Sequence, residues 1–288
     1  MNAGIYTRDQ VPREQYDRLP QINISRLEWI EQSPAHLNHI LTNGADEDTD
    51  AMIRGRATHL AVFEPELFRE RCVVWEGASR RGKEWDAFCA RNRGKELLTE
   101  KMHETAVAIG QAVRRDRYAA PFLEHGRGEL TLIWKYVAAP VGAVAGYEFD
   151  CKGRIDFETD RALVDLKTTE DASPSAFART ALNLNYLAKA AWYTDAHRQL
   201  ARKLREYFIV AAETKAPYVV QVYRIPEDLL ELGRAKYREW LDRYAFCRAR
   251  NSWPGYGDGP TDLVLPEWAQ PYDEEGGDPT GLGLSIGG

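Results

Sequence analysis

The sequence has no apolar run long enough to span a membrane, no signal-peptide pattern and no pair of closely spaced cysteines. We therefore expect a cytoplasmic protein with no membrane partner. Its cysteines are scattered, which argues against a structural zinc site, a disulfide framework or an iron–sulfur cluster. They are Cys72, Cys89, Cys151 and Cys247. The net charge of −6 counts mildly against a nucleic-acid partner, but such binding follows the local field of a groove rather than the total charge.

The length and composition suit one large domain with a loose end. A chain of 288 residues with 44% hydrophobic residues can bury a sizeable core. We expect residues 1–256 to form a single domain with helical elements at its N-terminal end. Residues 257–288 are rich in glycine, proline and acidic residues, and we expect them to be partly disordered.

Hydrophobic periodicity and capping residues predict the order of elements. Ser25 and Glu28 have the spacing of a capping box, and Ser33-Pro34 predicts the start of a second helix. The predicted helices cover 23–42, 50–63, a stretch after the basic loop at 79–83, 96–117, 184–205 and 226–250. The predicted strands cover 129–137, 147–151, the neighbourhoods of 156 and 165, 206–213 and 218–225, with a turn at Pro140–Gly142. This order predicts an α/β fold with a mixed central β-sheet flanked by helices and a helical N-terminal part.

The most informative stretch, residues 153–169, reads as two short strands joined by a polar turn at 159–161. Side chains alternate along a strand, so Asp165 and Lys167 should point the same way. If the strands pair as a hairpin, Asp156 can lie beside Asp165. Two carboxylates and one ammonium group would then converge, which suits a divalent-metal site for phosphodiester hydrolysis.

Further sequence pieces accompany the hairpin in a specific order between about residues 22 and 268. They are Ile24-Ser25-x-Leu27, Ser33-Pro34-Ala-His36, the run from Arg54 through His59 to Pro65, Arg80-Arg81-Gly-Lys83, Glu129 at a strand start, Gly153-Arg-Ile-Asp156, Val164-Asp165-Leu-Lys167-Thr-Thr169, Tyr186 with Ala190-x-Trp192-Tyr193, and Trp253-Pro-Gly-Tyr256. Together they resemble the PD-(D/E)XK nuclease superfamily, and more closely its RecE-type branch of phage and prophage exonucleases related to exonuclease VIII. The resemblance implies a restriction-endonuclease-like core.

The resemblance also implies roles for single residues. Asp156 matches the first metal-binding aspartate, Asp165 the second acidic position and Lys167 the catalytic lysine. His59 matches a helix histidine that adds a metal ligand in RecB-like nucleases. Glu129 matches an upstream glutamate on the neighbouring strand, which we group with the catalytic residues.

The chemistry of these groups predicts the cofactor. Hard cations prefer oxygen ligands, so the carboxylates of Asp156 and Asp165 and the backbone carbonyl of Leu166 suit Mg²⁺. His59 would add a nitrogen ligand, which Mn²⁺ tolerates well, so we expect Mn²⁺ to substitute. Lys167 would orient or deprotonate the attacking water, or offset phosphate charge.

Five further residues are predicted to contact DNA. Arg80, Arg81 and Lys83 form a basic loop that could grip the backbone or a 5′ phosphate. Tyr193 and Lys189 lie one turn apart on the helix predicted at 184–205. Lys189 departs from the family pattern, which places glutamine there, and would contact a phosphate as a point charge.

The resemblance predicts a Mg²⁺-dependent 5′→3′ exonuclease that acts on double-stranded DNA ends. It would leave 3′ single strands for a RecT-like single-strand annealing partner, and it would assemble as a homo-oligomeric ring. Two alternatives stay open. One is another RecB-like nuclease, associated with a helicase or a CRISPR system, and the other is a catalytically silent DNA-binding or scaffold protein.

Overall fold

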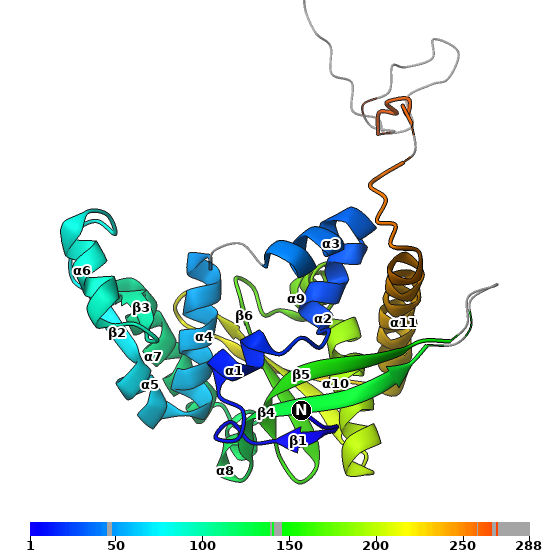
Figure 1. Ribbon diagram of the computed structural model, residues 1–288. Helices are drawn as coiled ribbons and strands as arrows, with labels where there is room; N and C mark the ends of the chain where they lie inside the picture. Colours follow the sequence, from blue (N-terminus) through cyan, green and yellow to red (C-terminus); the bar gives the residue numbers. More distant parts are fainter. Residues whose placement is uncertain (45–47, 139, 141–145, 258, 267–268, 270–288) are drawn as a thin grey trace, which may run out of the picture.

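The structure is a computed structural model that describes residues 1–44, 48–138, 140, 146–257, 259–266 and 269. Its centre is a six-stranded sheet with the strand order β1-β4-β5-β6-β7-β8 (Figure 1). The strands are β1 (Gly4–Tyr6), β4 (Arg127–Val137), β5 (Glu148–Glu158), β6 (Ala162–Thr169), β7 (Glu206–Glu213) and β8 (Val220–Ile225). β6 and β7 are parallel, and the other neighbours are antiparallel. The predicted α/β fold with a mixed central sheet is therefore confirmed.

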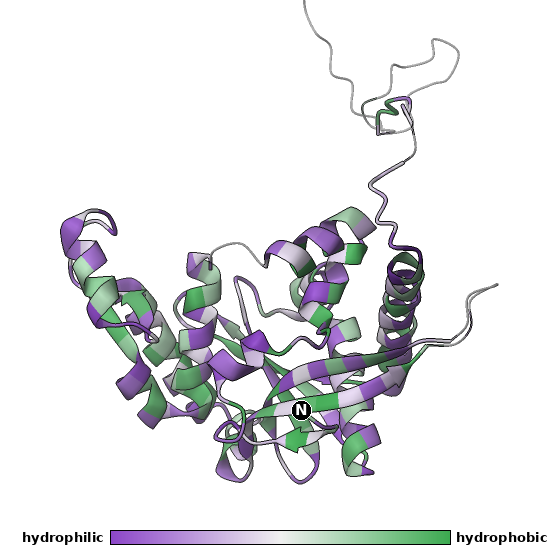
Figure 2. Cartoon of the chain, viewed as in Figure 1, coloured by the Kyte–Doolittle hydropathy of each residue, from purple (hydrophilic) through white to green (hydrophobic). Residues whose placement is uncertain are grey.

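Helices cover both faces of the sheet (Figure 1). One face packs against α2 (Ile24–Leu27), the 3-10 helix η1 (Glu28–Ile30), α3 (Pro34–Asn43), α9 (Pro174–Asn183), α10 (Tyr186–Ala201) and α11 (Glu227–Arg250). The other face packs against α4 (Asp50–Phe63), α7 (Glu100–Arg115) and α8 (Ala120–Glu124). Figure 2 shows hydrophilic and hydrophobic residues alternating along α11, as expected of a helix with one face on the core.

Two smaller units complete the chain before the tail. The short helix α1 (Arg13–Arg18) lies near the middle of the view in Figure 1. An arm extends to the left and contains α5 (Pro65–Arg71), β2 (Cys72–Trp75), α6 (Lys83–Arg91) and β3 (Glu96–Thr99). Within the arm, β2 and β3 form a two-stranded parallel sheet that packs with α4 and α7.

The alternation of side chains along the strands places them as predicted. On β4, Leu130, Leu132 and Trp134 all belong to the core cluster beneath α10 and α11. On β6, Val164 and Leu166 belong to the opposite cluster, beneath α4 and α7. Both faces of the central strands are therefore buried, so a polar side chain on β6 must find a partner inside the protein.

Capping explains where the N-terminal helices begin. The predicted helix at 50–63 is found with those bounds, and the hydroxyl of Thr49 caps it. Ser33 caps α3 as predicted. The predicted capping box at Ser25 is wrong, because the side chain of Asn23 accepts the hydrogen bond from the Arg26 amide and α2 starts one residue earlier than Ser25.

Three predicted segments differ in extent. The helix predicted at 96–117 begins as the strand β3, because its first four residues pair with β2, and α7 then starts after the Thr99 cap. The strand predicted at 147–151 and the first hairpin strand form the single strand β5. The helix predicted at 184–205 ends at Ala201, where Arg202 takes a left-handed conformation with φ of 57°.

After α11 the chain first packs on the body of the protein, where the Pro254 carbonyl accepts a hydrogen bond from the Ala35 amide at 3.0 Å, and it then extends away (Figure 1). The turn predicted at Pro140–Gly142 and the disorder predicted for 257–288 fall largely outside the described residues. Among the residues that are described, no helix combines the length and the apolar character needed to cross a bilayer.

The buried carboxylate of Glu158 makes acid stability testable. It accepts hydrogen bonds from His197 Nε2 at 2.7 Å and Arg127 Nη2 at 2.6 Å, at the end of β5. Burial raises the pKa of Glu158, but His197 and Arg127 outweigh burial and lower this pKa to about 2. Because the folded-state pKa lies below the unfolded one, this contribution is complete above about pH 4.5 and is lost as the pH falls toward 2. We expect it to be about 3 kcal/mol of unfolding free energy.

Urea unfolding of wild type and Glu158→Gln at pH 6 and pH 3 measures this effect. The difference in unfolding free energy between the two proteins should be smaller at pH 3 than at pH 6. A difference that does not change with pH would contradict the assigned role of Glu158.

Candidate metal centre

The predicted hairpin exists, and its strands separate where the carboxylates lie. The turn at 159–161 is held by the Thr159 hydroxyl, which accepts a hydrogen bond from the Ala162 amide at 3.0 Å. Only two register pairs join β5 to β6, and both lie next to the turn. Beyond them, the Asp156 carboxylate accepts the Leu166 amide at 2.9 Å. A side chain of β5 therefore occupies the place of a backbone partner, which leaves room for ligands between the strands.

Three potential ligands meet at this opening. His59 comes from α4, Glu129 from β4 and Asp156 from β5, and one ligand atom from each lies within 4.8 Å of the others. His59 Nδ1 lies 3.3 Å from Asp156 Oδ2, and His59 Nε2 lies 3.0 Å from the Leu166 carbonyl oxygen. Bonds of about 2.0–2.6 Å to one ion would span these separations. Two carboxylates and an imidazole form a donor set that fits Mg²⁺ or Mn²⁺. The Leu166 carbonyl faces the other ring nitrogen of His59, and its place as a ligand stays a prediction.

Glu129 reaches this group through an unusual backbone conformation. It lies between the register pairs Gly128–Phe157 and Leu130–Ile155, opposite Asp156. Its φ is 53°, in the left-handed region that residues other than glycine rarely adopt. Such a conformation persists only when its surroundings enforce it, and it is concentrated at functional sites.

Asp165 and Lys167 point the same way along β6, as the alternation predicts. Their charged atoms, Asp165 Oδ2 and Lys167 Nζ, lie 2.5 Å apart. The Lys167 ammonium group thus pairs with the Asp165 carboxylate, which the sequence predicted to bind the metal. Asp165 is not one of the three clustered ligands. Its place as a ligand stays a prediction, and in this structure it is the partner of Lys167.

Opposing charges shift the pKa values in the centre. Burial raises the pKa of Asp156, but His59, Lys167 and the Leu166 amide outweigh burial and lower this pKa to about 2. For Asp165, burial and the Asp156 charge outweigh Lys167 and raise the pKa to about 6. Burial lowers the pKa of Lys167, but the two aspartates outweigh it, so its pKa is raised and the amine is protonated at neutral pH.

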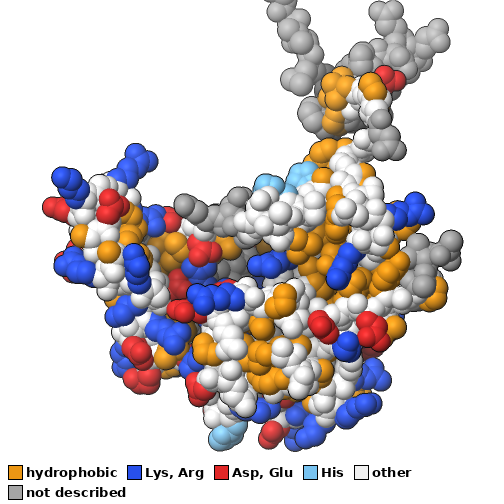
Figure 3. All heavy atoms as spheres, viewed as in Figure 1, with side chains coloured by type: hydrophobic (Ala, Val, Ile, Leu, Met, Phe, Trp, Pro, Cys, Tyr) orange, Lys and Arg blue, Asp and Glu red, His pale blue; other side chains and the backbone are white. Residues whose placement is uncertain are grey.

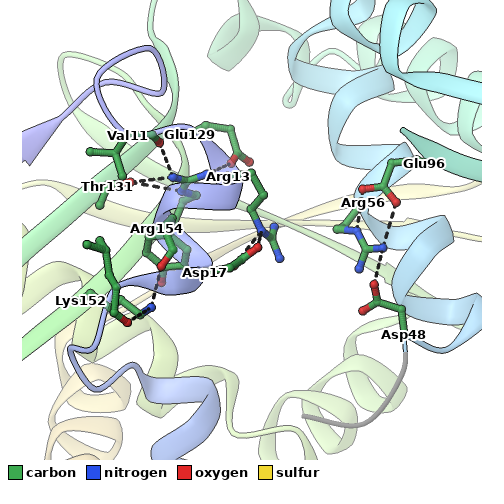
Figure 4. A network of polar contacts seen from close by, with 12 residues as sticks. Val11, Arg13, Asp17, Asp48, Arg56, Glu96, Glu129, Thr131, Lys152 and Arg154 are labelled. Atoms are coloured by element: carbon green, nitrogen blue, oxygen red, sulfur yellow. Dashed lines mark hydrogen bonds and ion pairs between the residues drawn. The ribbon is translucent and has the colours of Figure 1, made fainter. Parts of the chain in front are cut away.

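A buried arginine that the sequence analysis left without a role supports Glu129. Arg154 Nη1 lies 3.3 Å from Glu129 Oε2, and its guanidinium group also donates to the Thr131 hydroxyl and to the Val11 carbonyl at 2.6 Å (Figure 4). It lies over the ring of Tyr16, 4.5 Å from the centroid. The sequence Gly153-Arg-Ile-Asp156 could have indicated this supporting role, because an arginine on a buried strand needs several hydrogen-bond acceptors.

The N-terminal segment around α1 is attached to the sheet by a second buried cation. Lys152 Nζ donates to the carbonyl oxygens of Tyr16 and Leu19 at 2.7 and 2.8 Å (Figure 4). In the same view, the side chain of Arg13 extends from α1 toward the side where Arg56 lies. The segment is therefore held against β5, the strand that carries Asp156, although no helix was predicted before residue 23.

We expect Arg154→Lys to weaken Mn²⁺ binding roughly 10- to 100-fold, the usual loss when a partner of a metal ligand is removed. Lysine keeps the charge but lacks the planar fork that bonds three acceptors at once. Isothermal titration calorimetry measures the affinity. Arg224→Lys, on the edge strand β8, is the matched control, and equal affinities for the two variants would contradict the positioning role.

The predicted DNA contacts occupy two separate places. Lys83 begins α6, which is at the outer end of the arm (Figure 1), and Arg80 and Arg81 precede it. Arg80 is paired with Asp50, the first residue of α4. On the face seen in Figure 3, the surface is hollowed between this arm and the α2–α3 side, and Lys and Arg side chains gather around the hollow. The predicted DNA contacts of Arg80, Arg81 and Lys83 stay predictions.

Lys189 and Tyr193 lie on α10, across from the arm. Lys189 Nζ is 3.1 Å from Glu28 Oε2 and 3.2 Å from the Leu184 carbonyl oxygen. Tyr193 packs against Gly153, where an added Cβ would come within 2.9 Å of the tyrosine ring. Burial raises the pKa of Tyr193 well above its usual range. This packing explains the glycine at 153, while the predicted DNA contacts of both residues remain predictions.

The fold, a mixed sheet flanked by helices, is that of a PDDEXK-like domain. Residues 23–261 match the family model described as a PDDEXK-like domain of unknown function (DUF3799), and the chain belongs to that family. A search of curated protein sequences gave no match.

Two solved structures resemble the chain. A crystal structure from Eubacterium rectale, named "Putative exonuclease", has 13% sequence identity and a TM-score of 0.59, and the alignment covers 90% of this chain and 96% of that one. At this identity the likeness concerns the fold. A crystal structure of SSO0001 has 12% identity and a TM-score of only 0.28, with 78% of this chain and 91% of that chain covered.

Proposed function

We propose that this protein is a divalent-metal-dependent nuclease, specifically a RecE-type 5′→3′ exonuclease that degrades linear double-stranded DNA. The observation that carries the proposal is the meeting of His59, Glu129 and Asp156 beside the Lys167–Asp165 pair. Membership in a PDDEXK-like family and the fold shared with a protein named as an exonuclease support it.

The residues of the centre would have separate roles in phosphodiester hydrolysis. His59, Glu129, Asp156 and the Leu166 carbonyl would hold Mg²⁺, with Mn²⁺ as a substitute. When bound, the ion supplies Lewis-acid polarisation of the phosphodiester and a stronger water nucleophile. Lys167 is protonated at neutral pH, so its role is to offset negative charge on the phosphate. Asp165 holds that ammonium group in place.

The polarity and the partners extend the same proposal. The products would be 3′ single strands for a RecT-like annealing protein, and a homo-oligomeric ring would keep the enzyme on its DNA. Mass measurement by light scattering tests the ring, and co-purification with a RecT-like annealing protein tests the partner.

Digestion of end-labelled DNA tests the activity. With Mg²⁺, a linear duplex should be degraded, a covalently closed circle should resist, and a 5′ label should be released as short products before a 3′ label. EDTA should stop the reaction. Cleavage of the circle or early release of the 3′ label would favour another RecB-like nuclease, and no cleavage with either ion would favour the silent DNA-binding alternative.

A further inference from the structure

A surface pocket of about 460 Å³ lies between η1 and the junction of α9 with α10. Its wall includes the indole of Trp29 and the side chain of Leu184, which are 39% and 49% exposed. Side-chain amides from Gln32, Asn183 and Asn185 also line it, together with the charged groups described below. A flat apolar surface next to groups that both donate and accept hydrogen bonds suits a planar heterocycle.

The pocket is linked to the metal centre through one tyrosine ring. Lys167 Nζ lies 5.2 Å from the centroid of Tyr186, and Lys189 Nζ, at the pocket, lies 5.8 Å from the same centroid. The two ammonium groups are therefore no more than about 11 Å apart. A stacked strand advances about 3.4 Å per nucleotide, so the pocket is about three nucleotides or fewer from a phosphate at Lys167.

The charges in the pocket favour a base over a phosphate. Glu28 is paired with Lys189 at 3.1 Å, and Glu31 is paired with Lys236 at 2.7 Å. Each carboxylate is thus offset, and the lining has no surplus positive charge to attract a phosphate. The carboxylate and amide oxygens instead present acceptors of the kind that recognise base amino groups.

We infer that this pocket binds an unpaired base of the strand whose phosphate lies at the metal centre. The inference rests on the proposed nuclease function, because it assumes nucleic acid at Lys167. A base exposes its ring face to an indole only when it is unstacked from its own duplex, so the occupant is single-stranded. The pocket would then hold a frayed end beside the reacting phosphate.

Fluorescence anisotropy in EDTA tests the pocket without hydrolysis. The probes are a labelled duplex with a five-nucleotide single-stranded extension at one end and the same duplex with an abasic extension, made with each polarity. Wild type should bind the base-containing extension at least about fivefold more tightly, since stacking on an aromatic side chain is typically worth that or more per base. Trp29→Ala should lose the preference, and Trp29→Phe should retain most of it.

Two further variants separate the pocket from general effects on folding. Asn183→Trp fills the pocket from an exposed position and should also abolish the preference. Tyr118→Ala removes an aromatic side chain that is 60% exposed and outside the pocket lining, and it should keep the preference. Equal binding of both extensions by wild type, or an unchanged preference in both Trp29→Ala and Asn183→Trp, would overturn the inference.

The outcomes also distinguish this inference from the proposed function. Metal-dependent cleavage without a base preference would refute the pocket alone. A base preference without cleavage by any divalent ion would support the pocket and refute the nuclease. A change in oligomeric mass in Trp29→Ala, without a base preference in wild type, would assign the surface to contact between copies of the chain and overturn the inference.

Discussion

We expect Asp156→Asn to lose at least about 100-fold in metal-dependent DNA hydrolysis and in Mn²⁺ affinity. Asp156 contacts both His59 and the Leu166 amide, and its pKa of about 2 keeps it ionised at neutral pH. The amide keeps the shape but removes the negative charge that the cation requires. Loss of a mere partner of a metal ligand typically costs 10- to 100-fold, so loss of the ligand should cost at least the upper figure.

The measurements are initial rates on a linear duplex and calorimetric titration with Mn²⁺. Asp150→Asn is the matched control, because Asp150 is on the same strand with its side chain 58% exposed, away from the ligands. Near-normal hydrolysis by Asp156→Asn, with Asp150→Asn also normal, would remove Asp156 from the centre.

Lys167→Met should have opposite effects on catalysis and on metal binding. Hydrolysis should fall at least about 100-fold, because a positioned charge that stabilises a transition state is typically worth 10²–10³-fold. Mn²⁺ affinity should be equal to wild type or higher, because the ammonium group no longer competes with the ion for Asp165. Methionine is similar in length and leaves the aliphatic packing in place.

Rates and titrations on the same preparation test this pair of effects. Lys189→Met is the control for metal affinity, since Lys189 has the same side-chain exposure of 20% and is also paired with a carboxylate. Its Mn²⁺ affinity should equal that of wild type. Weaker Mn²⁺ binding by Lys167→Met than by Lys189→Met would show that Lys167 supports the site rather than competes for it.

The sequence predicted the elements whose signals are local. The helix at 50–63 carries its own cap at Thr49, and the hairpin carries its own turn at 159–161. Strand alternation placed Asp165 and Lys167 on one side of β6. These features depend on neighbours in the chain, so residue patterns are sufficient to find them.

The remaining features depend on partners distant in the sequence. The strand β3 was taken for the start of a helix because its pairing with β2 has no local signal. The contact of Arg154 with Val11 spans 143 residues and could not be read from either segment. Whether Asp165 pairs with Lys167 or binds a cation depends on the balance of charges in a buried site. The spacing of residues along a strand does not reveal that balance.

The attachment of the N-terminal segment has a consequence for the order of assembly. The carbonyl groups of residues 11, 16 and 19 bind side chains of β5 that follow them by 133 to 143 residues in the chain. During synthesis this segment leaves the ribosome long before its partners, so it can dock only after β5 has emerged. The Val11 carbonyl therefore meets Arg154 late, and a nascent chain that ends before β5 lacks both Asp156 and the arginine beside Glu129.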